Sequence, residues 1–188
     1  MRFPRLAGAA LVAVPAGAAA FVPPGPFVLS EAARAARARA GLTATYTVVD
    51  ATGRSARAAL TLAKGAKARF DPHPPPPGLD VLRALLAGDA KGAVDRCGAD
   101  PDPTALALHD GHIAIIVGAR DRRQSAPQVW VDQRRFVPLR ALVADLDIRL
   151  LDTAGLLARA GLPARIEVRR ANRTVWQATL TAPPHTTR

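Results

Sequence analysis

The feature that most constrains this chain is an alternation of apolar and polar residues between Pro127 and Asp152. The stretch, PQVWVDQRRFVPLRALVADLDIRLLD, divides into three segments separated by short polar turns. Successive side chains of a strand point to opposite faces of a sheet, so a period of two is typical of half-buried β-strands. We therefore predict three consecutive antiparallel strands, with Pro138 at a bulge or an edge because proline cannot donate to a ladder.

The segments before and after this stretch show the same alternation. The further predicted strands are Leu42–Asp50, Ser55–Ala63, Ala66–Asp71, the hairpin Leu106–Gly118, Ala164–Arg170 and Thr174–Ala182. Asp110-Gly111, between two apolar runs, is the sequence of a two-residue type I′ turn. No strand-helix-strand pattern indicates a parallel sheet. Antiparallel strands in this number predict an α+β fold: a curved antiparallel sheet, or half-open β-barrel, with short helices covering its concave face.

Three helices are predicted from capping residues and apolar spacing. Ser30 precedes an Ala/Arg-rich run that ends at Gly41, which predicts a helix over Ser30–Ala40. Leu79–Leu86 has leucines at helical spacing on one side. A short helix is also expected from Asp152 or Thr153 to Arg159.

The remaining segments are predicted to be irregular. His73–Gly78, HPPPPG, is interpreted as a stiff connector rather than a ligand for proline-binding domains. Ala87–Pro103 is predicted to be a loop, with an extra turn near Val94, and Ala119–Ala126 is predicted to be a charged loop. Pro183–Arg188 is expected to fray.

The first twenty residues resemble an export signal. Arg2 and Arg5 precede an Ala/Val/Leu-rich run that ends in Ala18-Ala19-Ala20. A basic start, an apolar run and small residues are typical of a secretory signal, and the run is short for a membrane span. We predict a signal peptide over residues 1–20, cleaved near Ala20, and one periplasmic domain over residues 21–188. An uncleaved N-terminal anchor is the alternative.

The charge balance favours anionic partners but not nucleic acid. The chain has 26 Lys and Arg against 15 Asp and Glu, a formal charge of +11, which attracts anionic lipid headgroups and other polyanions. A compositional bias toward Arg and Ala is the alternative explanation. The arginines are scattered and no basic run is interleaved with aromatic residues, so a nucleic-acid surface is not expected.

No constellation of residues indicates catalysis, and we predict no enzyme, no cofactor and no metal. The single cysteine, Cys97, cannot form an internal disulfide and is interpreted as a buried thiol. His109 and His112 are expected to face each other across the hairpin turn as a solvated pair, since no third metal ligand is near in sequence. Ser30, Ser55 and Ser125 lie in no nucleophile motif.

Three motifs resemble those of the LolA/LolB-like superfamily of periplasmic lipoprotein carriers. The first is the export signal followed by a helix and the strand LTATYT, and the second is TLAKGAKARFD, a strand, turn and strand that end in an Arg-aromatic pair. The third, QVWVDQRRFVPLR, is similar to the family's W-x-D…F-x-P-x-R hairpin. The resemblance covers nearly the whole mature chain.

This resemblance implies a half-barrel that holds acyl chains in an apolar cavity under a helical lid, bound to a lipid or lipidated protein. It implies that Arg69 stands at the position that carriers link to lid closure. The cavity residues it implies are Tyr46, Leu60, Leu62, Phe70, Leu82, Leu85, Leu86, Trp130, Trp176 and Leu180. For each aromatic residue, an ordinary place in the core is the alternative.

Two readings of function follow. The first is an exported lipid or lipoprotein carrier, peripheral at most to the membrane and monomeric. The second is a non-catalytic envelope module that docks through arginines on the outer face of its sheet. Those arginines are Arg57, Arg69, Arg165 and Arg169.

Overall fold

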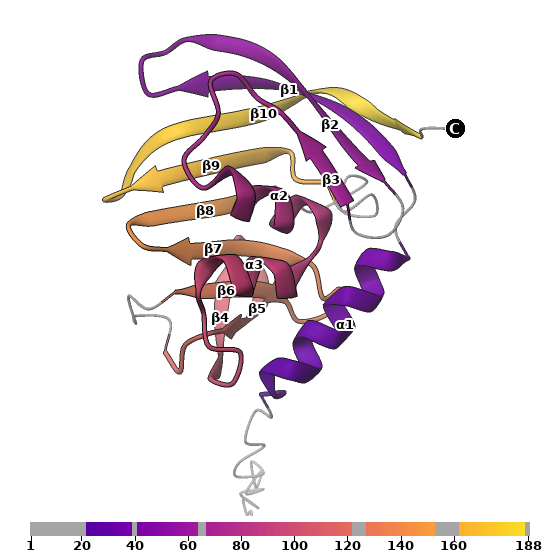
Figure 1. Cartoon of the computed structure of the whole chain (residues 1–188), viewed down its shortest axis with the longest axis vertical. Coiled ribbons are helices and arrows are strands. Elements are labelled where there is room, and N and C mark those ends of the chain that lie inside the picture. Colours follow the sequence, from indigo (N-terminus) through magenta and orange to yellow (C-terminus); the bar gives the residue numbers. More distant parts are fainter. Residues whose placement is uncertain (1–21, 39–40, 64–66, 122–126, 153–161, 187–188) are drawn as a thin grey trace, which may run out of the picture.

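A computed structural model describes residues 22–38, 41–63, 67–121, 127–152 and 162–186. In these ranges the chain forms one ten-stranded antiparallel sheet with three short helices on one side (Figure 1). The strands are β1 Leu42–Asp50, β2 Ser55–Ala63, β3 Lys67–Phe70, β4 Thr104–His109, β5 His112–Val117, β6 Gln128–Asp132, β7 Pro138–Val143, β8 Leu146–Leu151, β9 Arg165–Arg170 and β10 Arg173–Thr186. The helices are α1 Gly25–Arg37, α2 Leu79–Ala87 and α3 Ala90–Cys97. The predicted fold class is confirmed.

The order of the strands explains why the helices lie where they do. The sheet runs β3-β2-β1-β10-β9-β8-β7-β6-β5-β4, so β3 and β4, the strands on either side of α2 and α3 in the chain, form its two opposite edges. The segment that contains α2 and α3 must therefore cross from one edge to the other. We call α2 and α3 the helix pair.

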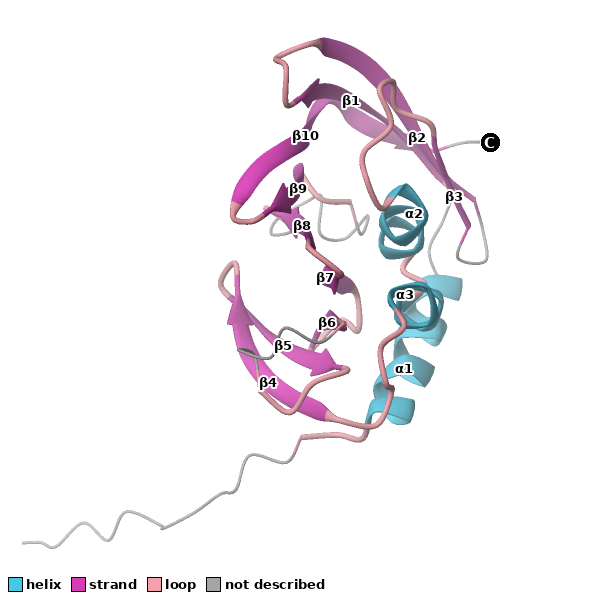
Figure 2. Ribbon diagram, turned by 60° about the vertical axis from the view of Figure 1, so that its left-hand side comes forward, coloured by secondary structure: helices cyan, strands magenta, loops and turns pink. Residues whose placement is uncertain are grey.

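That crossing is possible because the sheet is curved. In a flat sheet with strands about 4.8 Å apart, the outermost of ten strands would lie about 43 Å apart. The nine residues of α2 and eight of α3 extend only about 26 Å at about 1.5 Å per residue. The sheet curls around the helices and shortens the distance, and the helix pair lies across its concave side (Figure 2).

The predicted three-strand stretch is present as β6, β7 and β8. Pro138 begins β7, and the register between β6 and β7 shifts between Trp130 and Val131, so the predicted bulge is confirmed. Asp110 and Gly111 both have positive φ, 48° and 76°, as a type I′ turn requires. Strand β2 has the bounds predicted from its alternation.

Two helix predictions were wrong. Helix α1 begins at Gly25, five residues before the predicted Ser30, with Pro26 in its first turn, where a missing N–H costs nothing. Gly25 fits there because a Cβ on it would lie 1.6 Å from the carbonyl oxygen of Pro101. The segment predicted as a loop contains α3, in which the side chain of Asp89 accepts a hydrogen bond from Gly92 N (2.8 Å) and Gly98 ends the helix with φ 71°.

The C-terminal tail was also predicted wrongly. Strand β10 continues to Thr186, where its backbone pairs with Leu42 of β1, so the segment predicted to fray extends the sheet. The predicted signal peptide, the predicted helix after Asp152 from residue 153 onward and residues 122–126 of the charged loop lie outside the described residues.

The sheet separates two apolar clusters. The larger lies between the concave face and the helices, and the smaller contains Ala114, Ile116, Ala119, Trp130 and Leu139. Neighbours along β6 alternate between them: Val129 and Val131 belong to the larger cluster and Trp130 to the smaller. Since successive strand residues point to opposite faces, the smaller cluster lies on the face away from the helices, which we call the outer face.

Candidate functional site

The concave interior brings together nine of the ten residues predicted to line an apolar cavity. At its centre three aromatic rings meet edge to face, with Phe70 5.9 Å from Tyr46 and 6.2 Å from Trp176 between ring centroids. All three side chains are at most 2% exposed. Leu60 and Leu62 of β2 join the same cluster, and Leu180 is partly buried against it.

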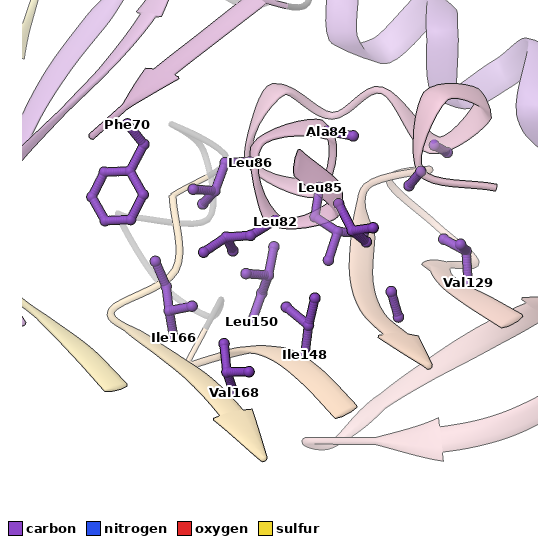
Figure 3. Close-up of a cluster of buried hydrophobic side chains, with 14 of the residues drawn as sticks. Phe70, Leu82, Ala84, Leu85, Leu86, Val129, Ile148, Leu150, Ile166 and Val168 are labelled. Atoms are coloured by element: carbon purple, nitrogen blue, oxygen red, sulfur yellow. The ribbon is translucent and has the colours of Figure 1, made fainter. Parts of the chain in front are cut away.

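Helix α2 supplies the opposite wall of this interior. Leu82, Leu85 and Leu86 are at most 1% exposed, as their spacing on one side of the predicted helix required. They point toward the sheet, where Ile148 and Leu150 of β8 and Ile166 and Val168 of β9 face them (Figure 3). These side chains pack together into an apolar layer between the sheet and α2.

Two hydrogen bonds satisfy the polar atoms of the interior aromatic residues. The Tyr46 hydroxyl donates to the carbonyl oxygen of Pro163 at 2.8 Å, and burial raises the pKa of that hydroxyl. Trp176 Nε1 donates to the carbonyl oxygen of Pro74 at 3.2 Å, in the proline-rich connector before α2. The connector is therefore held against the sheet next to the start of the helix pair.

A group of charged residues at the rim joins α2 to β3. Arg69 Nε donates to Asp71 at 3.2 Å, and Arg83 of α2 pairs with the other oxygen of Asp71. Arg83 Nε also donates to the carbonyl oxygen of Phe70 at 3.0 Å. The hydrogen bond from Arg69 lowers the pKa of Asp71, and Arg83 adds to this effect. Arg69 is thus connected to the covering helix through a shared carboxylate.

Glycines in the left-handed conformation bound the helix pair. Gly78 precedes α2 with φ 70°, Gly88 separates the helices with φ 76°, and Gly98 follows α3 with φ 71°. Other residues rarely adopt such angles, so the chain turns sharply at these three points. The two helices consequently form a short unit with a defined break at each end.

Trp130 is not part of the interior, which corrects one predicted site residue. Its ring lies on the outer face, with the guanidinium of Arg140 4.5 Å from the ring centroid, and its Nε1 donates to Gln128 at 2.7 Å. Arg140 in turn donates two hydrogen bonds to Asp147, at 2.7 and 2.9 Å, and Arg149 donates to the same carboxylate. The prediction failed because Trp130 lies between Val129 and Val131 on β6, so its side chain points to the face opposite to theirs.

The charges of this outer group are set by Arg140 and Arg149, which share the carboxylate of Asp147. Burial alone would raise the pKa of Asp147, but the hydrogen bonds and charges of Arg140 and Arg149 outweigh burial, and the pKa lies below its ordinary value. The side chains are 15–25% exposed, so they are largely withdrawn from solvent. The group carries one positive charge more than its acid neutralises.

His109 and His112 face each other in the register, as predicted, but they are not a solvated pair. His109 is 8% exposed and its ring meets Trp130 edge to face at 5.8 Å. Burial, with Arg140 and Arg149 nearby, lowers its pKa to about 4. His112 Nδ1 lies 3.1 Å from Asp132. Among the described residues no group of three or more His, Cys, Asp or Glu side chains could hold a metal.

Three surface hollows bounded by described residues lie away from the interior aromatic residues. One, of about 430 Å³, lies between β3 and the helix pair and is lined by Lys67, Ala68, Asp80, Arg83, Ala84, Ala87, Asp89 and Arg96. The other two adjoin β4 and the tip of the β4–β5 hairpin. Cys97 is buried in α3, and burial raises the pKa of its thiol to about 11. In the described ranges, no helix has the length and apolar character of a membrane span.

Comparison with known proteins finds solved structures to which the chain is similar. No family model and no curated protein matches it. It is similar to a solved LolA superfamily protein from Nitrosomonas europaea at 10% identity and a TM-score of 0.41, over 89% of this chain and 95% of that one. It is also similar to the MucA/MucB complex of Pseudomonas aeruginosa at 12% identity and a TM-score of 0.28, over 86% of this chain and 56% of the matched one. At such identities and TM-scores the likeness does not extend to function.

Proposed function

We propose that this protein is an exported carrier that holds an acyl chain of a lipid or lipidated protein between the concave face of its sheet and the helix pair. The observation that carries the proposal is the interior itself. It is an apolar layer from Tyr46 and Trp176 to Leu82 and Leu86, closed on one side, among the described residues, by the helix pair together with α1.

Admission of an acyl chain requires the helix pair to move, and the energies permit that. Exposing Leu82, Leu85 and Leu86 would cost about 5–9 kcal/mol at about 1.5–3 kcal/mol per side chain. A buried chain of about 14 CH₂ groups would return about 11 kcal/mol at about 0.8 kcal/mol each. The leucine contacts are apolar and undirected, and the left-handed glycines mark where the backbone would turn. Burial of the ligand would therefore offset the exposure of these three leucines.

The two tryptophans provide an internal test, because the chain has only two and they lie on opposite faces of the sheet. We expect a lipopeptide or phospholipid with brominated acyl chains to quench the fluorescence of Trp176 in a Trp130→Phe variant. The same ligand should leave Trp130 unquenched in the matched Trp176→Phe variant. The ligand would be added below its critical micelle concentration, with the unbrominated form as the control.

Quenching of Trp130 alone, or of neither residue, would remove the carrier proposal. A further variant, Leu85→Asp, places a charge inside the interior and should abolish quenching of Trp176. Far-UV circular dichroism of that variant shows whether it still folds; if it does not, Leu82→Phe, which fills the same layer with an apolar ring, takes its place.

A second candidate is the envelope module, favoured by the placement of the arginines. Ala58, Ile166 and Val168 belong to the concave cluster, so Arg57, Arg165 and Arg169, their neighbours in sequence, point to the outer face. Arg57 and Arg165 are exposed there, although Arg165 lies 3.4 Å from Glu167. Sedimentation with vesicles of pure phosphatidylcholine or with added phosphatidylglycerol tests this function. Binding that needs the anionic lipid and is lost at 0.5 M salt, on the order of a 4 Å screening length, would favour it.

A further inference from the structure

Among the described residues, strand β4 leaves one row of backbone groups without a partner strand at the edge of the sheet. Gly118 N donates to Pro103 O at 2.9 Å, and the register places these two residues opposite each other. Residues of an antiparallel ladder alternate between bonding to one side and to the other. The N–H and C=O groups of Thr104, Leu106 and Leu108 therefore point away from β5.

The strand itself lacks most of the devices that usually keep edge strands apart, although the Thr104 hydroxyl donates to the carbonyl oxygen of Pro23 at 3.1 Å, so the segment before α1 lies beside its first residue. The strand TALALH contains no Lys, Arg, Asp, Glu or Pro, and its pairing with β5 shows no bulge. Leu108 is 67% exposed, and Ile113, its partner on β5, is 51% exposed beside it. In the part of the chain that the structure describes, β5 is the one strand that pairs with β4.

The opposite edge, β3, is guarded. It has four residues, two of which, Lys67 and Arg69, are charged and exposed. Arg83 Nε also donates a hydrogen bond to the carbonyl oxygen of Phe70, the last residue of β3, at 3.0 Å. The two edges therefore differ: β3 has charged side chains that disfavour pairing with another strand, and β4 has none.

We propose that β4 is a dimerisation strand, on which the β4 of a second copy of this chain pairs antiparallel about a two-fold axis at Leu106. In that register Leu106 lies opposite its own symmetry mate, and Thr104 of each copy lies opposite Leu108 of the other. The three outward residues of each copy then exchange both hydrogen bonds with their partners. The two sheets become one continuous sheet of twenty strands.

A second copy fits this edge because a two-fold interface must be self-complementary. The outward groups are distributed evenly on both sides of Leu106, so both copies are satisfied at once. The leucines at 106 and 108 lie on the same side of the strand and would meet their symmetry mates across the axis. The strand itself is also uncharged in a chain of formal charge +11, and the two charged residues that line the hollow beside it, Arg120 and Asp121, have opposite signs.

The contact is small, so we expect a dimer that forms and separates with concentration. A single strand pair with its flanking side chains falls at or below the size of a standard interface, about 800 Å² per partner. The monomer expected from the sequence is therefore revised, since the unpaired groups of β4 become evident only from the register. This inference does not depend on the proposed carrier function.

Sedimentation velocity over about 1 µM to 1 mM of the expressed protein tests the dimer against three variants of one residue. Leu108→Lys puts a charge on the edge, and Leu108→Pro removes only an outward N–H, which the ladder with β5 does not use. Both should shift the monomer–dimer midpoint at least tenfold toward higher concentration. Leu108→Val, the matched control, keeps the N–H and the apolar surface and should shift it less than threefold. Circular dichroism confirms that each variant is folded.

Cysteine cross-linking tests the register in a Cys97→Ser background. Leu106→Cys should form disulfide-linked dimers on mild oxidation, because directly opposite Cα atoms lie about 5.5 Å apart, within reach of a disulfide. Ala107→Cys alone should not, because it faces Ala105 of the other copy. A mixture of Ala105→Cys and Ala107→Cys chains should cross-link.

A protein that is monomeric up to about 1 mM would overturn the inference, as would a dimer that Leu108→Lys and Leu108→Pro leave unchanged. Failure of Leu106→Cys to cross-link in a protein that does dimerise would also overturn it. An extended strand of another protein found on β4, with no self-association, would replace the second copy by a different partner.

Discussion

The two faces of the sheet are stabilised by different kinds of interaction, although each contains one buried tryptophan. On the concave face Trp176 packs against Phe70 and is surrounded by aliphatic side chains from the sheet and the helix pair. On the outer face Trp130 lies under Arg140, which belongs to an ion-pair group with Asp147 and Arg149. One face is held by undirected apolar contact and the other by directed, charge-assisted bonds.

This difference indicates which face of the sheet can rearrange its contacts. Apolar contacts have no fixed donor–acceptor geometry, so the concave face is the side on which the proposed acyl chain would be accommodated. Charged groups that are withdrawn from water depend on a fixed geometry and cannot be separated cheaply. We infer that the outer face is the rigid support and the helix side is the mobile one.

The largest expected effect comes from the same substitution on each face. Leu82→Ala removes a fully buried side chain from the large cluster, and we expect a loss of about 4 kcal/mol of unfolding free energy. Leu139→Ala, in the small outer cluster and also fully buried, should cost about 2 kcal/mol because fewer neighbours surround the cavity. Urea unfolding measures both, and equal losses would break the comparison.

The second largest expected effect is a pH dependence of stability, which arises from His109 beside Trp130 on the outer face. The pKa of His109 is lowered from its ordinary value of 6.5 to about 4 in the folded protein. Between these two pH values the unfolded chain therefore binds a proton at His109 and the folded chain does not. The contribution of neutral His109 to the free energy of unfolding is fully present above pH 6.5. It is lost as the pH falls toward 4, and the total loss is on the order of 3 kcal/mol.

Denaturation of the unchanged protein and of His109→Gln at pH 7 and pH 4.5 tests this dependence. The variant should show a much smaller drop between the two pH values, and His112→Gln, on the same turn, should keep the drop. Asp132 and Asp147 do not interfere, because their pKa values lie below the ordinary carboxyl range. A variant with the same pH slope as the unchanged protein would contradict the assignment to His109.

A smaller effect is expected from the acid shared by the two outer arginines. Asp147→Asn leaves Arg140 and Arg149 without a counter-charge while they are 17% and 25% exposed, and we expect a loss of about 2 kcal/mol. Asp145→Asn is the matched control: that acid is 60% exposed beside Arg170 and should cost less than about 0.5 kcal/mol. Thermal unfolding compares the two, and indistinguishable midpoints would show that the outer group is not a support.

The smallest effect on stability is expected at the rim, where function is the better readout. Arg69 is 87% exposed, so Arg69→Ala should change the unfolding free energy by less than about 0.5 kcal/mol. If the Arg69–Asp71–Arg83 group restrains α2, the same variant should speed the quenching of Trp176 by brominated lipid. Stopped-flow fluorescence measures that rate, with Arg57→Ala as an exposed control on β2. An unchanged rate would remove Arg69 from lid closure.

Most strands of this fold could be predicted because alternation and turn residues are local signals. The bulge at Pro138 and the Asp110-Gly111 turn followed from the chemistry of single residues. Helix α3 was missed because the segment that contains it, Ala87–Pro103, is rich in Gly, Asp and Pro, although Asp89 and Gly98 were usable start and stop signals. The burial of His109 and the outer position of Trp130 depend on register and curvature, which no local pattern contains.

The strand order also determines when this molecule can be finished. Strands β1 to β3 connect to the other seven only through β10, which is made after every other strand in the chain. Until β10 arrives, the inner edge of β1 has no partner, and the three-stranded piece cannot complete its core. Closure of the sheet therefore has to wait for β10, and β1 to β3 join the other described strands only after it.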